Sequence, residues 1–192
     1  MKKIIAITGG IGSGKSSAAK FLSEMGYPVF SCDQIYQEVI LSLDYIEKVT
    51  NLFPECIVNG RIDKKILAQI VFTDKSKLTR LNGIAHPLIM EKLFEKMYNC
   101  NQELVFAEVP LLFEGNYEDK FDSVIVIMRN KEKRIQSIIS RDGITREQAL
   151  DRINAQFDYD NSNERFKNCN AILIENNGTI EELETQIQKI NF

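Results

Sequence analysis

The feature that most constrains the fold of this chain is the segment Gly9–Ser16, whose sequence GGIGSGKS fits the pattern G-x-x-x-x-G-K-[ST]. It stands between an apolar run, Ile4–Ile7, and a helical pattern from about Lys15 to Met25. A glycine-rich turn between a buried strand and a helix lets successive backbone N–H groups point at one anion, and the positive end of the helix adds to the attraction. The sequence therefore predicts a strand–loop–helix unit that binds nucleotide phosphates.

Two side chains of this loop have predicted roles of their own. Lys15 is expected to reach the β- and γ-phosphates as a point charge, and Ser16 is expected to place its hydroxyl on Mg²⁺. The same pattern serves nucleotide hydrolases, switches and small-molecule kinases, so it does not identify the acceptor of a phosphoryl group. The residues predicted to contact the nucleotide here are Gly10, Ile11, Gly12, Ser13, Gly14, Lys15, Ser16 and Ser17.

Strand and helix patterns alternate along much of the chain, which predicts an α/β fold with a parallel sheet of five strands flanked by helices. The expected strands after the first are Tyr27–Phe30, Leu104–Val109, Ser123–Met128 and Ala171–Glu175. Thr145 and Thr179 are each followed three residues later by Gln or Glu, which is the spacing of a capping box. Helices are therefore expected to begin at these two threonines.

A long helical stretch interrupts this alternation between Gln34 and Cys100. Asp63 is expected to cap one of its helices, and Pro87 is expected to begin another. The stretch is longer than one crossover between strands requires. We therefore predict a single domain over residues 1–192, with a core of about residues 1–33 and 101–192 and a helical, acceptor-binding insertion of about residues 34–100.

Composition excludes several partners. The net charge of −3 argues against a general nucleic-acid-binding protein, which usually carries a basic excess. No apolar run approaches the roughly 20 residues of a membrane-spanning helix, and the four cysteines form no C-x-x-C pair. We expect a cytoplasmic protein that binds no nucleic acid and no membrane and, since no long heptad pattern is present, a monomer.

Asp33 follows the second predicted strand, at the edge of the sheet where ligands bind in open α/β folds. A carboxylate at this place can orient an acceptor hydroxyl and accept its proton. Because a helix is expected to begin immediately afterwards, Asp33 can equally be the residue that caps that helix. The spacing leaves both interpretations open.

A set of short motifs, in order along nearly the whole chain, resembles that of the dephospho-coenzyme A kinases. The motifs are Ile7–Ser16, Ser31–Asp33, His86-Pro87, Glu108–Glu114, Arg141–Gly143, Arg152–Gln156 and Asn176–Gly178. The phosphate loop alone is generic, but the ordered set is specific to this family.

The resemblance implies a P-loop NTPase fold and the transfer of the γ-phosphate of ATP, with Mg²⁺, to the ribose 3′-hydroxyl of dephospho-coenzyme A. It implies that Asp33, Lys15 and Arg141 are catalytic, and that a mobile lid lies within about residues 114–145. Arg141, Asn176 and Gly178 are implied to contact the nucleotide, and Thr8, Asp33, His86, Glu108 and Leu111 the acceptor. Glu108 can instead reach the Mg²⁺ shell through water or form a salt bridge.

The chain also departs from the family. Ser137 stands one helical turn before Arg141, where many relatives carry another arginine, and the stretch from Phe157 to Glu164 looks longer than usual. Arg134 and Arg165 are candidates for the missing charge. Two alternative functions remain open at this point: another small-molecule kinase that acts on a nucleoside or nucleotide, and a nucleotide-binding regulatory module.

Overall fold

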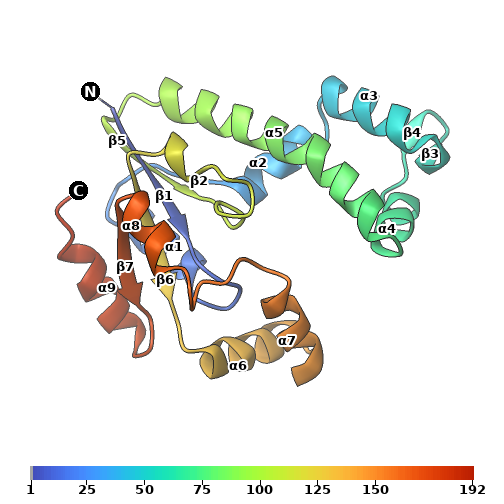
Figure 1. Cartoon of the computed structure of the whole chain (residues 1–192). Coiled ribbons are helices and arrows are strands. Elements are labelled where there is room, and N and C mark those ends of the chain that lie inside the picture. The colour runs from blue at the N-terminus through green and yellow to red at the C-terminus, as the bar shows by residue number, and fades with distance from the viewer. Residues whose placement is uncertain (1) are drawn as a thin grey trace. The chain divides into compact units, whose positions relative to one another are not determined.

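The computed structural model describes residues 2–192, apart from the side chain of Phe72. The chain divides into two compact units, the first formed by Met1–Ser31 and Met97–Phe192 and the second by Cys32–Lys96 (Figure 1). The sequence placed the corresponding boundaries a few residues later, at 33/34 and 100/101. That the second unit binds the acceptor stays a prediction.

The first unit is built around a sheet of five strands in the order β2-β5-β1-β6-β7 (Figure 1). Each pair of neighbouring strands is parallel, as the sequence predicted. The strands are β1 (Lys3–Thr8), β2 (Val29–Ser31), β5 (Leu104–Glu108), β6 (Ser123–Met128) and β7 (Ala171–Glu175). Because β1 is central, the carboxyl ends of its neighbours β5 and β6 meet beside the loop that follows it.

Helices α1 (Lys15–Glu24) and α9 (Ile180–Gln188) pack against each other and against the sheet. Ala18 and Leu22 are four residues apart on α1, so they face the sheet together, and both are fully buried. Alternate residues of the strands meet them, because successive side chains of a strand point to opposite faces. The shared core contains Ile5, Ile7, Ala18, Leu22, Phe106, Ile125, Ile127, Ile174, Leu183 and Ile187.

The remaining helices of this unit are α6 (Lys131–Asp142), α7 (Arg146–Asn154) and α8 (Asn163–Asn168), with a short 3-10 turn, η2 (Glu118–Lys120). Helix α6 follows the end of β6 and packs on α7 (Figure 1). Both predicted capping boxes are present: the hydroxyl of Thr145 accepts from the Gln148 N–H, and that of Thr179 accepts from the Glu182 N–H. The predicted starts of α7 and α9 are therefore confirmed.

The second unit is mainly helical. It contains α2 (Cys32–Val39), α3 (Leu43–Leu52), η1 (Pro54–Cys56), α4 (Lys64–Phe72) and most of α5 (Lys75–Asn99). Asp63 caps α4, since its Oδ1 accepts from the N–H groups of Lys65 at 2.8 Å and Ile66 at 3.1 Å. A small antiparallel hairpin, β3 (Ile57–Val58) with β4 (Arg61–Ile62), was not predicted. Its turn residues Asn59 and Gly60 both have positive φ, and Asn-Gly is a strong hairpin signal that the sequence contained.

The expectation that Pro87 begins a helix is wrong, because Pro87 lies inside α5. The helix begins at Lys75, where Asp74 caps it by accepting from the N–H groups of Ser76 at 2.8 Å and Lys77 at 3.3 Å. Proline removes one backbone hydrogen bond and crowds the carbonyl four residues earlier, here that of Gly83. The loss of one hydrogen bond is tolerated in a helix of 25 residues.

Candidate active site

The phosphate loop joins β1 to α1. Gly14 has φ +99°, a conformation that L side chains rarely adopt. A Cβ at Gly14 would lie 2.2 Å from Nδ2 of Asn176, and this Nδ2 donates a hydrogen bond of 2.8 Å to the carbonyl of Ser13. The loop is thus shaped by an amide from the end of β7, which needs glycine at position 14 to approach.

Asn176 and Gly178 were predicted to meet the adenine base. The structure shows Asn176 almost fully buried, with its backbone N–H on the carbonyl of Met128 at 2.8 Å and its side chain on the loop. Gly178 is exposed, just before the capping box of α9. Their contact with a base stays a prediction, whereas the support that Asn176 gives the loop is a finding that the sequence did not reveal.

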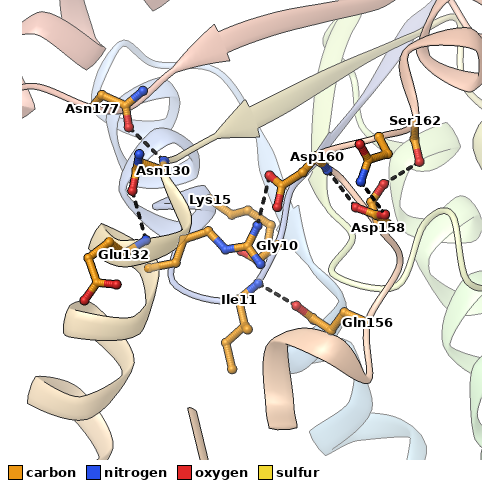
Figure 2. Close-up of polar contacts among 12 residues, drawn as sticks. Gly10, Ile11, Lys15, Asn130, Glu132, Gln156, Asp158, Asp160, Ser162 and Asn177 are labelled. Atoms are coloured by element: carbon orange, nitrogen blue, oxygen red, sulfur yellow. Dashed lines mark hydrogen bonds and ion pairs between the residues drawn. The ribbon is translucent and has the colours of Figure 1, made fainter. Parts of the chain in front are cut away.

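The donors of the loop are turned toward oxygen atoms of the protein. Lys15 Nζ donates to the carbonyls of Gly9 at 2.8 Å and Gly10 at 3.2 Å. The N–H of Ile11 donates to Oε1 of Gln156 at 2.6 Å, a contact that Figure 2 shows beside Gly10. The structure therefore gathers at one place the N–H and ammonium donors that the motif directs at phosphates.

Ser16 and Glu108 come together at the start of α1. Ser16 Oγ donates to Glu108 Oε1 at 2.7 Å, and Glu108, at the end of β5, is 9% exposed. The parallel register places Ile7 opposite Glu108, so β5 ends beside the loop. A hydroxyl and a carboxylate are hard oxygen donors of the kind Mg²⁺ takes, so this pair fits the metal. Within the described residues, no group of three or more His, Cys, Asp or Glu side chains is arranged to hold a metal ion by itself.

A cavity of about 490 Å³ opens beside α6. It is lined by Arg129, Lys133, Gln136, Ser137, Ser140 and Arg141, which include three cations and no carboxylate. Arg129 donates from NH1 to the carbonyl of Gly12 at 3.2 Å and to Ser137 Oγ at 3.0 Å. The cavity thus touches the loop through Arg129, a residue that the sequence analysis missed. Its position directly after a buried strand, at the ligand-binding edge of the sheet, was the available signal.

Arg141 is among the residues that line this cavity, and its hydrogen bonds go to Asp142. Its side chain is 61% exposed, and its Nε and NH2 donate to the two oxygens of Asp142 at 2.7 and 3.0 Å. The hydrogen bond with Asp142 raises the pKa of Arg141 and lowers the pKa of the Asp142 carboxyl. Arg141 is therefore a permanent cation held by its neighbour, and its catalytic role stays a prediction.

Thr8 and Leu111 were both expected to contact the acceptor. Thr8 is fully buried at the end of β1, and its Oγ1 lies 3.1 Å from the hydroxyl of Tyr159. Burial raises the pKa of Tyr159. Leu111 is 37% exposed after β5, whereas Leu112 and Phe113 are buried. Of the two predicted acceptor contacts, Leu111 is the accessible one.

The segment from Phe157 to Glu164, which looks long for the family, packs on aromatic rings. Phe113 stacks on Phe157 with ring centroids 4.7 Å apart, and Tyr159 and Phe166 complete the cluster. Arg165 lies over the rings of Phe113 and Phe157 at 5.3 and 5.2 Å. The guanidinium of Arg165 is thus used inside this cluster.

Asp33 and His86 belong to the second unit. Asp33 is the second residue of α2 and is exposed, and its carboxylate has no hydrogen bond or ion pair within the described part of the chain. It therefore does not cap α2 from the residue before the helix. His86 is half-buried in the middle of α5.

Comparison with known proteins identifies the family to which the chain belongs. The model of the dephospho-CoA kinase family matches residues 3–182. The chain belongs to the dephospho-CoA kinase family. It is 35% identical over 187 residues to a dephospho-CoA kinase of Thermus thermophilus, covering 97% of this chain and 89% of that relative. It is 36% identical over 188 residues to that of Fusobacterium nucleatum, covering 97% and 95%.

Solved structures agree with this assignment. TT1252 from Thermus thermophilus superposes with a TM-score of 0.79 at 35% identity, over 97% of this chain and 95% of that one. The dephospho-CoA kinase of Campylobacter jejuni gives a TM-score of 0.68 at 29% identity, over 98% and 95%. The predicted P-loop NTPase fold and the family resemblance are confirmed. Membership of this family makes the chain a transferase with ATP as a substrate, and neither alternative function is favoured.

Proposed function

We propose that the chain transfers the γ-phosphate of ATP to the ribose 3′-hydroxyl of dephospho-coenzyme A, the last step of coenzyme A synthesis. The observation that carries the proposal is the hydrogen bond between Ser16 and Glu108 at the foot of the phosphate loop, in a chain of the dephospho-CoA kinase family. It supplies oxygen ligands for a metal ion beside the donors for the phosphates.

The chemistry is an in-line displacement at phosphorus. The 3′-oxygen of the acceptor forms a bond to the γ-phosphorus while the bond from that phosphorus to the β–γ bridging oxygen breaks, and ADP leaves with the electron pair. The hydroxyl proton passes to the carboxylate of Asp33. A loose transition state asks little basicity of this group, so an ordinary carboxylate suffices. The ammonium of Lys15 stabilises the negative charge on the β- and γ-phosphates.

Mg²⁺ would be held by Ser16 Oγ, with Glu108 bound directly or through water, together with the phosphates. When bound, the ion neutralises the charge of the β- and γ-phosphates and fixes their geometry. Glu108 orients the Ser16 hydroxyl, because it accepts that group's hydrogen and so leaves the oxygen lone pairs for the metal.

The remaining contacts follow from the same assignment. We infer that Arg141 contacts the nucleotide and takes part in catalysis, that Asn176 and Gly178 contact its adenine base, and that His86, Leu111 and the helical second unit serve the acceptor. A lid that lies within about residues 114–145, outside the buried strand β6 and the fixed start of α6, excludes water during transfer. No helix in the described part of the chain is long and apolar enough to cross a membrane. We take the working enzyme to be a cytoplasmic monomer that binds no nucleic acid.

The test is ADP release by the purified protein with Mg-ATP, with and without dephospho-coenzyme A, beside the variant Asp33→Asn. We expect ADP formation that depends on the acceptor, coenzyme A as product by mass, and a loss of about 100-fold or more in kcat for the variant. Asp44→Asn is the matched control, since Asp44 is an exposed carboxylate on α3 paired with Lys48. If dephospho-coenzyme A does not stimulate ADP release, the proposal is refuted.

A further inference from the structure

Arg134 is a buried cation whose charge is only partly neutralised. It is 4% exposed on α6, and its nearest carboxylate oxygen, Oδ1 of Asp160, lies 3.7 Å from NH1. Its Nε is buried and has no hydrogen-bond partner among the described residues. A charge taken out of water is costly unless well-placed partners satisfy it. The fold thus retains a guanidinium that lacks a complete set of acceptors.

This guanidinium lies against the phosphate loop. A Cβ at Gly10 would be 3.0 Å from Cζ of Arg134, and a Cβ at Gly12 would be 2.8 Å from the Arg134 carbonyl. Both the side chain and the backbone of Arg134 therefore pack on the loop, which is possible because the loop offers glycine at both places. The position of Arg134 is fixed by this packing.

The start of α6 is fixed as well. Asn130 caps it by accepting from the Glu132 N–H at 2.9 Å, and the Asn130 N–H donates to Oδ1 of Asn177 at 2.8 Å, as Figure 2 shows. Asn177 follows Asn176, whose side chain holds the loop. Loop, helix and the turn after β7 thus form one hydrogen-bonded unit around Arg134.

The segment after α7 supplies oxygen acceptors both to the phosphate loop and to Arg134. Gln156 presents an amide oxygen to the Ile11 N–H, as Figure 2 shows. Asp160 presents a carboxylate to Arg134. Asp158 holds the segment in a turn, since its Oδ1 accepts from the Asp160 N–H at 3.1 Å and its Oδ2 from Asn161 Nδ2 at 2.8 Å. The terminal phosphates of a nucleotide would provide the same kind of oxygen acceptors, both for the N–H group of the loop and for the arginine beside it.

We propose that Arg134 binds the terminal phosphates of the nucleotide, and that Gln156 occupies the Ile11 N–H of the loop and Asp160 occupies Arg134 until the nucleotide replaces them. The inference rests on the proposed function and adds a phosphate-binding residue to it. Phosphate oxygens carry more charge than the single carboxylate at 3.7 Å and can meet the planar fork of a guanidinium at two points. The exchange of Asp160 for phosphate therefore completes the contacts that Arg134 lacks.

The two other arginines that the sequence analysis singled out, Arg165 for the missing charge and Arg141 as a catalytic residue, are placed less well for this role. Arg141 is 61% exposed and holds Asp142 with two donors. Arg165 donates to Glu118, to the Phe113 carbonyl and to Asn116, and it stacks on the aromatic cluster. Within the described residues, Arg134 is the member of these three that touches the loop.

The test measures the dissociation constant of ATP by calorimetry, and kcat and KM with Mg-ATP and dephospho-coenzyme A. Because Asp160 competes with phosphate, we expect Asp160→Asn to bind ATP about three- to tenfold more tightly. Arg134→Ala should bind ATP at least tenfold more weakly and lose about 100-fold or more in kcat. Arg134→Lys should recover part of the binding, since it restores the charge without the fork. Asp151→Asn, which changes an exposed carboxylate on α7, is the matched control and should leave the affinity unchanged.

Unchanged ATP affinity in both Asp160→Asn and Arg134→Ala, with thermal unfolding midpoints close to that of the parent protein, would overturn the inference. If Arg134→Ala does not fold, Asp160→Asn and Arg134→Lys still decide it, because parental affinity in both refutes it. The binding measurement needs no acceptor. A parent protein that binds ATP but makes no coenzyme A would therefore refute the proposed function separately from the role of Arg134.

Discussion

Ser16, in the first turn of α1, donates a hydrogen bond of 2.7 Å to Glu108, the last residue of β5. The two residues are 92 positions apart in the sequence. They meet because β5 is the parallel neighbour of β1 and its register sets Glu108 opposite Ile7, one residue before β1 ends. Ligands bind at this edge in open α/β sheets, where loops follow the carboxyl ends of the strands.

Glu108→Gln tests the metal role of this pair. The amide keeps the shape of the side chain but removes its charge, so we expect the Mg²⁺ concentration for half-maximal activity to rise about tenfold, as for other residues that orient metal ligands. Initial rates at fixed ATP and varied Mg²⁺ measure this. Glu24→Gln, an exposed carboxylate on the same helix as Ser16, is the control and should not change it. An unaltered Mg²⁺ requirement in Glu108→Gln would contradict the assignment.

Gly14→Ala tests how the loop is shaped. A methyl group here meets Asn176 Nδ2 at 2.2 Å in addition to the strain of φ +99°. We expect a loss of about 2 to 3 kcal/mol in the free energy of unfolding and a large loss of ATP affinity. Urea unfolding and calorimetric binding are the measurements.

Gly26→Ala separates strain from steric contact. Gly26 also has a positive φ, of +91°, but a Cβ there has no neighbour within 4 Å. This variant should lose about 1 to 2 kcal/mol and bind ATP like the parent protein. Equal losses of ATP affinity in the two variants would show that contact with Asn176 is not what fixes the loop.

The sequence predicted those parts of the fold that depend on local patterns. The glycine-rich motif, the apolar strands and the capping boxes at Thr145 and Thr179 each act over a few residues, and the structure confirms them. The prediction at Pro87 was wrong because a proline is compatible both with the first turn of a helix and with the interior of a long one. The cap at Asp74, which decides between these, is an equally local signal that was overlooked.

The candidate site was predictable in detail only where one motif contains the residues. Lys15 and Ser16 follow from the loop pattern. Arg134 was a candidate for a missing charge and Gln156 ends a family motif, but the sequence did not place either against the loop, and it gave no role to Arg129 or Asp160. They meet the loop through packing of α6 and of the segment after α7, and contacts of that kind are set by tertiary structure. The sequence predicted that Asn176 contacts the adenine base. In the structure its side chain donates a hydrogen bond to the carbonyl of Ser13, because the turn after β7 lies against the loop.

The pair of Arg141 and Asp142 predicts a pH dependence of stability. Arg141, and to a lesser degree Arg152, lowers the pKa of Asp142 from its ordinary value of about 3.9. A carboxyl with a lowered pKa in the folded state stabilises the protein above its unfolded-state pKa, and this contribution is lost as pH falls through the folded-state value. We therefore expect Asp142→Asn to lower the melting temperature at pH 7, and the difference to shrink as the pH is lowered toward 3.

Melting curves of the parent and Asp142→Asn between pH 7 and 3 measure this difference. Asp44→Asn is the control, since it removes an exposed i,i+4 ion pair with Lys48 on α3. Its melting temperature shows how much stability is lost when any paired surface carboxylate is removed. A difference between parent and Asp142→Asn that stays constant down to pH 3 would exclude a contribution from the ionised carboxylate.

Arg129 links the cationic cavity beside α6 to the phosphate loop, and Arg129→Ala tests whether ATP uses that cavity. The side chain contributes a charge and bonds to Gly12 and Ser137. Since hydrogen bonds of charged groups contribute about 1.5 to 3 kcal/mol, we expect ATP to bind about tenfold or more weakly. Arg146→Ala is the matched control, because Arg146 is exposed and pairs with Glu132 away from the cavity lining. Equal affinities of Arg129→Ala and Arg146→Ala for ATP would place the nucleotide outside this cavity.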